Sequence, residues 1–469
     1  MTQIFSKISL SLMILAAAGC SSSSKSTKAG KGYVTYSSGS FKLQPYKEVQ
    51  LENGMKVFFI QDQTLPRVSL TLLVKVGSLQ ESAADAGLNS LTAYMLEQGT
   101  QTRDAMTIAD EFGQIASSLS ISPSYDTTTV FADSLSNSKE TLLNLFADVV
   151  MSPAFKDSEI NRIRSQMVAS LQKKVDNPSS FANEKADAFI FGSHPYGRDT
   201  SGTPESLKTL RKQSLIKHFL TYYRPNNASL AVVGNFDSSF EEQVKMGFGK
   251  WGKRNIPALN VPAPPESDSL KVRAVVKKNL QQTQIRVGEL GITRNDPDYL
   301  TLRLANEVLG GSFASRLNQK IRDDLGLTYS IYSGFDTKLQ RGSFDISTFT
   351  KNDSVGKTLA ETLKVVNDFV AQGATEQELA AAKSQLIGQF PRAIETPDRL
   401  AYNLLALDFY GIPVTYLTNF NSNVNKVKLK DLNAAIQKRL HPKALRVLIY
   451  GDEKILPQLK SYSPEVVKM

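Results

Sequence analysis

Apolar residues recur with two different periods along this chain, and each period predicts one kind of element. Leu88, Leu91 and Met95 are spaced three and four residues apart, which predicts a short helix with one apolar face. Residues 68–78 are rich in β-branched and aliphatic side chains and predict a strand. Residues 48–62 place Asn-Gly between two strand-like runs, an arrangement that predicts a hairpin.

Four further segments continue this alternation of helix and strand. Residues 107–119 and 139–152 are typical of helices, and residues 127–135 between them alternate like a strand. Residues 158–175 have the pattern of a long amphipathic helix, and Pro178 in the following Asp-Asn-Pro predicts its end.

The chain is predicted to repeat one plan on either side of a proline-rich linker. Residues 255–269 contain four prolines and few large apolar side chains, which predicts a boundary between two lobes. Ser165-Gln166 in the long helix has a counterpart in Ser384-Gln385, and Pro178 has one in Pro397, both 219 residues later.

A strand near the end of each half supports the same repeat. Residues 224–234 are echoed by residues 441–451, and both keep a proline and a glycine nine residues apart around a strand. Helices clustered between strand runs favour an α+β sandwich in each lobe. We expect the lobes to span residues 46–254 and 270–469, each of ordinary domain size.

The segment 87–100, GLNSLTAYMLEQGT, resembles the signature of the pitrilysin/insulinase family of zinc peptidases. That family reads G-L-A-H-F-L-E-H-M-L-F-x-G-T here, and five framework positions match without a gap: Gly87, Leu88, Met95, Gly99 and Thr100. The resemblance covers nearly the whole chain after residue 45. It implies two homologous lobes, each an antiparallel-rich sheet packed against helices, that form a clam-like chamber.

The positions that carry the family's chemistry do not match. In H-x-x-E-H, two histidines one helical turn apart bind zinc and the glutamate activates a metal-bound water. The residues at these positions and at the third ligand position, eight residues before Pro178, are Ser90, Ala93, Tyr94 and Ser170. Hydroxyls are poor neutral zinc ligands and alanine is no base. The resemblance therefore implies that this chain binds no zinc and no other cofactor.

The chain has only three histidines, His194, His218 and His441, and none lies three or four residues from another. A helical metal-binding pair is therefore excluded. His194 and His441 precede prolines at predicted turns, which favours structural roles, and His218 lies among apolar residues of a predicted helix. No G-x-S-x-G elbow, phosphate-binding loop or dinucleotide fingerprint is present.

One chemical feature of the family is retained in the second half. Arg322 and Tyr329 fall on the arginine and tyrosine of the family motif R-x-x-x-x-L-x-Y. In active members this pair binds and polarises the peptide carbonyl at the zinc site. Both side chains donate hydrogen bonds and neither is a base at neutral pH. The alternative, on residue type alone, is an arginine paired with Asp323 or Asp324 and a tyrosine in the core.

The family's first lobe also holds peptide substrate on an edge strand. The corresponding segment here is residues 120–123, which end in proline. Because proline has no backbone donor, we expect the first lobe to have lost its substrate-binding strand as well as its metal.

Composition and the N-terminal segment bear on the partners and the cellular location of the protein. The formal net charge is +10, but residues 1–32 hold four lysines and no acid, so the remainder carries only +6 and a nucleic-acid partner is not favoured. Residues 1–19 have the form of a secretory signal. Cys20, the only cysteine, follows small residues as in a bacterial lipobox, although Ala17 replaces the usual leucine. An ordinary signal peptide with an incidental thiol is the alternative.

We expect acyl chains on Cys20 to anchor the protein to a membrane through a flexible tether, residues 20–45. The residue after the cysteine, Ser21, is typical of lipoproteins on the outer membrane facing the periplasm.

Three functions remain open at this point. The family includes peptidases of two chains, in which one chain carries H-x-x-E-H and the other lacks zinc but supplies the arginine and tyrosine. This sequence resembles the second kind, which implies a zinc-bearing partner subunit and a peptide substrate. The alternative is a lipoprotein scaffold that binds peptides or partners without cleaving them. An enzyme with an unrecognised site is the third possibility.

Overall fold

The computed structural model describes residues 27–29, 33–35, 37–38 and 41–469. The predicted signal, Cys20 and much of the predicted tether lie outside these residues. Four short strands precede the main fold: β1 (Thr27–Ala29), β2 (Tyr33–Thr35), β3 (Ser37–Ser38) and β4 (Phe41–Lys42). Within the described residues, no helix has the length and apolar character needed to cross a membrane.

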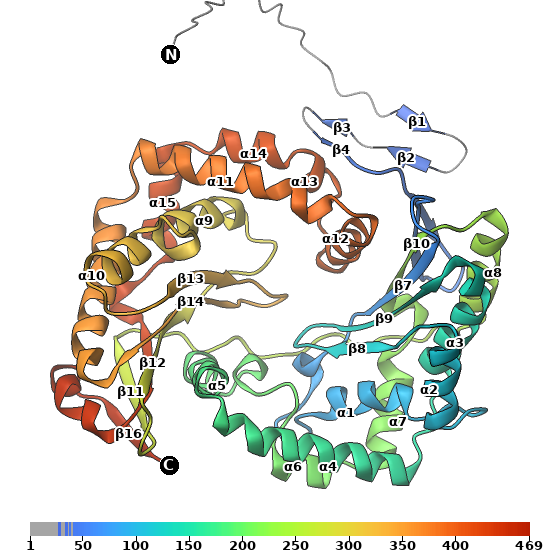
Figure 1. Ribbon diagram of the computed structural model, residues 1–469, viewed down its shortest axis with the longest axis horizontal. Helices are drawn as coiled ribbons and strands as arrows, with labels where there is room; N and C mark the ends of the chain where they lie inside the picture. The colour runs from blue at the N-terminus through green and yellow to red at the C-terminus, as the bar shows by residue number, and fades with distance from the viewer. Residues whose placement is uncertain (1–26, 30–32, 36, 39–40) are drawn as a thin grey trace, which may run out of the picture.

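Two six-stranded sheets form the centre of the molecule, one in each half of the chain (Figure 1). The first sheet has, in spatial order, β5 (Lys47–Gln50), β6 (Lys56–Gln61), β10 (Ala228–Gly234), β7 (Arg67–Val74), β9 (Thr128–Leu135) and β8 (Ser120–Pro123). The second has β13 (Ile331–Asp336), β14 (Ser343–Lys351), β12 (Gln282–Leu290), β15 (Arg446–Gly451), β11 (Lys271–Val276) and β16 (Glu465–Lys468).

Helices surround both sheets. The first half has α1 (Leu88–Tyr94), α2 (Ala105–Gln114), α3 (Lys139–Met151), α4 (Asp157–Lys173), α5 (Pro178–Phe191), α6 (Pro204–Thr209), α7 (Lys212–Tyr222) and α8 (Ser238–Gly249). The second half has α9 (Tyr299–Asn306), α10 (Val355–Gln372), α11 (Glu376–Ile394), α12 (Pro397–Tyr410), α13 (Thr415–Thr418), α14 (Phe420–Lys426) and α15 (Leu429–Arg439). The chain between α8 and β11 contains no helix or strand.

Short turns of 3₁₀ helix connect many of these elements: Ser78–Gln80, Met95–Glu97, Ser136–Ser138, Lys174–Asp176, Pro195–Gly197, Pro225–Asn227, Asn352–Ser354, Pro442–Ala444 and Glu453–Tyr462. Two π-helical segments follow α9, at Glu307–Gly311 and Asn318–Asp324.

The predicted α+β class with two related lobes is confirmed, and the two sheets share one topology. β10 pairs in parallel with β6 and antiparallel with β7, and β15 pairs in the same way with β11 and β12. These two central strands are the segments whose sequences echo each other. The outer strands differ, because β5 is antiparallel to β6 whereas β16 is parallel to β11.

Strand β6 shows why each sheet needs cover on both faces. Its side chains alternate, so that Val57 and Phe59 pack into one apolar cluster while Phe58 and Ile60 pack into another. All four side chains are buried. Residues i and i+2 of a strand share a face, so a strand apolar at every position must be buried on both sides.

Each half provides one helix that covers the sheet of the other half (Figure 1). Phe181, Ala182 and Ala186 of α5 pack with Leu448 and Tyr450 of β15. In the opposite direction, apolar residues of α12 join the cluster on the inner face of the first sheet. The two lobes are therefore interlocked by a reciprocal exchange of helices.

Candidate functional site

The framework glycine at the start of the signature segment has a structural role. Gly87 caps α1 with φ of 90°, a left-handed conformation, and a Cβ there would lie 2.6 Å from the carbonyl oxygen of Ser201. The carboxylate of Glu81 accepts the backbone N–H groups of Gly87 at 3.0 Å and Asn89 at 2.5 Å. Burial nevertheless raises the pKa of Glu81 to about 8.

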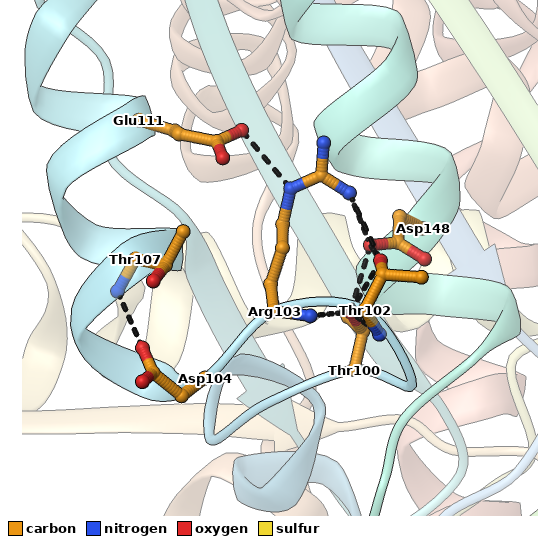
Figure 2. Close-up of polar contacts among 7 residues, drawn as sticks. All are labelled: Thr100, Thr102, Arg103, Asp104, Thr107, Glu111 and Asp148. Carbon is orange, nitrogen blue, oxygen red and sulfur yellow. Dashed lines mark hydrogen bonds and ion pairs between the residues drawn. The ribbon is translucent and has the colours of Figure 1, made fainter.

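The end of the segment is fixed by a polar network (Figure 2). Thr100 donates its hydroxyl to Asp148 at 2.8 Å, and Arg103 bridges Asp148 at 2.7 Å and Glu111 at 3.0 Å. Asp104 caps α2 by accepting from the Thr107 N–H at 2.8 Å. Gly87 and Thr100 therefore have structural roles that do not require the zinc chemistry.

The residues at the family's zinc positions divide into two groups. Ser90 is buried and donates its hydroxyl to the carbonyl oxygen of Thr200 at 2.7 Å, and Ala93 is completely buried. Tyr94 and Ser170 instead line one open pocket of about 590 Å³. Two of the four positions are thus part of the core, and two face a cavity.

The side chains around this pocket are polar on one part and apolar on another. Glu97 and Asp199 line the same pocket as Tyr94. Burial, and then the charges of these two carboxylates, raises the pKa of the Tyr94 phenol. Sequence reasoning missed both acids. Lys174 forms an ion pair with Asp199 and a second one with Glu184 at 3.1 Å.

No metal site replaces the lost one in the residues that the structure describes: no group of three or more His, Cys, Asp or Glu side chains is placed to hold an ion. Burial lowers the pKa of both His194 and His218 to about 4, so both are neutral at neutral pH. His218 contacts Asn89 at 3.1 Å, whereas His441 contacts Glu289 at 2.8 Å in the other half.

Arg322 and Tyr329 lie on the second half in different environments. The Arg322 guanidinium stacks 3.8 Å from the ring centre of Phe313 and pairs with Asp323 at 3.0 Å. Tyr329 is 85% exposed, so it is not a core residue. Among the described residues, no hydrogen bond joins the two side chains. Arg322 does pair with a neighbouring aspartate, as the alternative interpretation expected, but Tyr329 does not lie in the core as that interpretation also expected.

The edge strand of the first sheet is present, and the expectation that it no longer binds a peptide substrate stays a prediction. β8 pairs with β9 from Ser120 to Pro123, and the proline is the last residue of the strand. An edge strand tolerates proline because one row of its backbone groups needs no partner within the sheet. The corresponding edge of β13 is covered: Asn318 donates to the Ile331 carbonyl at 2.9 Å and Asn306 to the Ser333 carbonyl at 3.0 Å.

Two family models match most of the chain. A model described as insulinase (peptidase family M16) matches residues 56–204, and one described as peptidase M16 inactive domain matches residues 209–386. The chain belongs to the M16 family. The resemblance seen in the sequence is confirmed, and this M16 homologue carries none of the four residues of the family's zinc site.

Curated relatives match over most of their length. One is an "uncharacterized zinc protease YmxG" of Bacillus subtilis, 26% identical over 75% of this chain and 85% of that protein. Another is a "non-peptidase homolog YmxG" of Helicobacter pylori, 26% identical over 85% of this chain and 92% of that one. A crystal structure described as a peptidase M16 inactive domain from Pseudomonas fluorescens has a TM-score of 0.80 and 28% identity, covering 87% of this chain and 98% of its own.

Proposed function

We propose that this M16 homologue is the non-catalytic subunit of a two-chain peptidase and supplies Arg322 and Tyr329 to the zinc site of a partner. The observation that carries the proposal is the exposure of Tyr329. A large aromatic side chain that is 85% exposed contributes little to the fold, yet it stands at the family's substrate-binding position.

The chemistry of the first half fits a subunit without its own metal. Ser90 and Ala93 are buried in neutral contacts, and Tyr94 and Ser170 present only hydroxyls. These residues do not fit a zinc ion, which needs imidazole, thiolate or carboxylate ligands. Zinc would therefore belong to the partner, a chain with an intact H-x-x-E-H motif, and the substrate would be a peptide.

The retained pair has a defined task in such a complex. When water attacks a peptide carbonyl, negative charge develops on the carbonyl oxygen. A phenol and a guanidinium both donate hydrogen bonds to that oxygen and stabilise the transition state more than the ground state. Stacking on Phe313 and pairing with Asp323 would hold the Arg322 side chain in one orientation before the partner binds.

The test is reconstitution with the zinc-bearing partner and measurement of turnover at equal complex concentration. We expect Tyr329→Phe to lower kcat by about 10²–10³-fold, the usual effect of losing one such donor. Arg322→Lys keeps the charge but loses the planar fork, so it should be nearly as damaging as Arg322→Ala.

Tyr332→Phe is the matched control, because Tyr332 is also an exposed tyrosine and lies only three residues away, on β13. It should leave kcat unchanged. If Tyr329→Phe assembles normally and cleaves at the rate of the unmodified complex, the proposal fails.

A scaffold that binds peptides without cleavage is the second candidate. It is favoured by the open pocket at Tyr94 and Ser170 and by the name of the H. pylori relative, a non-peptidase homologue. Normal turnover by the Tyr329→Phe complex would favour this candidate.

A further inference from the structure

The pocket at Tyr94 and Ser170 has a wall built from two parallel rows of one helix. Ile163, Met167 and Leu171 recur every four residues along α4 and line the pocket with apolar surface. Gln166, Ser170 and Lys174 recur with the same spacing and line it with polar groups. Residues four apart on a helix lie above one another on one face. The pocket therefore offers an apolar stripe beside a polar stripe.

Negative charge is concentrated at one part of the lining. Glu97 and Asp199 line the pocket together with Tyr94, and the pKa of the Tyr94 phenol is raised by burial and then by the charges of these two carboxylates. Asp199 is already neutralised by Lys174. Within the described residues, Glu97 has no cation at ion-pair distance.

The charge of Arg162 and a hydrogen bond with the Gln98 side chain both act on Glu97, but Arg162 forms its ion pair with another acid. Its guanidinium pairs with Glu159 at 2.7 Å and donates to Gln98, and it does not line the pocket. Burial raises the pKa of Glu97, so its ionised form lacks full compensation. A ligand that brings a positive charge would supply that compensation.

A positively charged group opposite Glu97 would suit an organic cation better than a metal ion. The two carboxylates are the only groups of metal-ligating type in the lining, and one of them is already paired. The volume of about 590 Å³ is far larger than an ion needs and lies in the ordinary range of organic ligand sites.

We propose that this pocket binds the side chain of a lysine or arginine from a peptide. The charged head lies at Glu97, and the aliphatic stem packs along Ile163, Met167 and Leu171. Long basic side chains combine an apolar stem with a charged end in this way. Loss of zinc would thus have left a pocket that recognises a basic peptide side chain instead of hydrolysing a peptide bond. The proposal concerns the isolated chain and does not depend on a partner subunit.

The experiment titrates the purified full chain, in the presence of a chelator, with capped tripeptides by ligand-observed NMR. The probes are Ala-Lys-Ala, Ala-Arg-Ala, Ala-norleucine-Ala and Ala-Glu-Ala, each with an acetylated N-terminus and an amidated C-terminus. We expect the lysine and arginine peptides to bind at least about tenfold more tightly than the norleucine peptide, because only they form a charge-assisted hydrogen bond. The glutamate peptide should not bind.

Two variants locate the site. Glu97→Gln preserves shape and should bring the affinity for Ala-Lys-Ala down to that for the norleucine peptide. Ser170→Phe fills the pocket from an exposed position and should abolish binding of both. Glu395→Gln removes one negative charge from an exposed residue at the end of α11 and should change nothing.

The proposal is overturned if lysine and norleucine peptides bind equally, or if Glu97→Gln behaves like Glu395→Gln. It is equally overturned if no probe binds the chain. The titration uses the isolated chain without a partner's zinc site, so its outcome and that of the reconstituted peptidase are independent.

Discussion

Helices α5 and α12 begin at prolines 219 residues apart, and each covers the sheet of the opposite half, but different chemistry attaches them. Two carboxylates hold α12. Asp398 pairs with Arg67 at 2.7 Å, and Asp408 pairs with Lys56 at 2.7 Å and with Lys75 at 2.9 Å. The contact between α12 and the first sheet, here called the α12 seam, therefore depends on ion pairs with residues in or next to the strands of that sheet. The contact between α5 and the second sheet is called the α5 seam.

Helix α5 is attached by a buried cation that has no acidic partner at ion-pair distance in the described chain. Arg286 of β12 donates to Asn183 at 2.5 Å and to the Ser179 hydroxyl at 2.9 Å, both on α5. Its remaining hydrogen bonds go to the Ser179 carbonyl of α5 at 3.3 Å and to its own sheet, including the Thr348 carbonyl at 3.0 Å. The Phe181 ring packs 4.7 Å from that of Tyr450.

The two seams should respond differently to salt, to protonation and to mutation. Ion pairs near the surface weaken with salt and disappear when the carboxylate is protonated. Neutral acceptors around a buried guanidinium do not titrate, but each is left without a donor if the arginine is removed. We therefore expect the α5 seam to be fragile toward mutation of Arg286, and the ion pairs of the α12 seam to weaken with salt and with acid.

Arg286→Ala should have the largest effect on stability. It removes a buried cation and leaves Asn183, Ser179 and the Thr348 carbonyl without their donor. We expect the free energy of unfolding to fall by about 3 kcal/mol. Urea denaturation of the full chain measures it.

Lys217→Ala is the control for that variant, because Lys217 is exposed on α7, and it should change the free energy by less than about 0.5 kcal/mol. A loss below 1 kcal/mol for Arg286→Ala would mean that packing of α5, and not the arginine, holds the seam.

Asp408→Asn should have a smaller effect that depends on pH. Burial opposes ionisation of Asp408, but hydrogen bonds from Lys56, Ser229 and Lys75 outweigh it and lower the pKa. Solvent near the pair limits the loss at neutral pH to about 1–2 kcal/mol.

The sign of the pH dependence follows from the lowered pKa. The stabilisation by Asp408 is complete above the ordinary aspartate value of about 3.9 and is lost as the pH falls through the lower folded-state pKa. The difference between the unmodified chain and Asp408→Asn should therefore shrink in acid, in denaturation curves measured from pH 7 to pH 3. A difference that stays constant would show that the charge of Asp408 is not what stabilises the seam.

Local rules in the sequence predicted the elements of the fold but not where they pack. The Asn-Gly turn was predicted, and Gly54 between β5 and β6 has φ of 89°. The sequence did not show that the Asn53 side chain also binds the Phe248 carbonyl at 2.8 Å. Pro178 was predicted to end a helix, and α4 does end before it. Pro178 also begins α5, capped by Asn177. Proline marks a boundary but cannot tell which sheet the next helix will cover.

The candidate site shows the same limit. Spacing to Pro178 selected Ser170, and the structure places it in one pocket with Tyr94. Glu97 was missed because it lies in the segment 87–100 at none of the positions that carry the family's chemistry, and Asp199 because its segment meets this one only in the folded chain. The one sequence signal for this pocket was the spacing of four residues along α4, which also suits any helix packed on a core.

The smallest expected changes in stability compare one site residue from each lobe. Ser90→Ala removes a buried hydroxyl that donates to the Thr200 carbonyl, and it should cost about 1 kcal/mol of unfolding free energy. Tyr329→Phe removes an exposed hydroxyl and should cost less than about 0.5 kcal/mol in the same urea series.

Equal losses in both variants would contradict the contrast, because Tyr329 would then contribute to the fold as Ser90 does. With the expected result, Ser90, at one of the family's zinc positions in the first lobe, is part of the core, and its mutation lowers the stability of the fold. Tyr329 in the second lobe would be free of that constraint. A residue that the fold does not need but that a reconstituted peptidase does need must act on something outside its own chain.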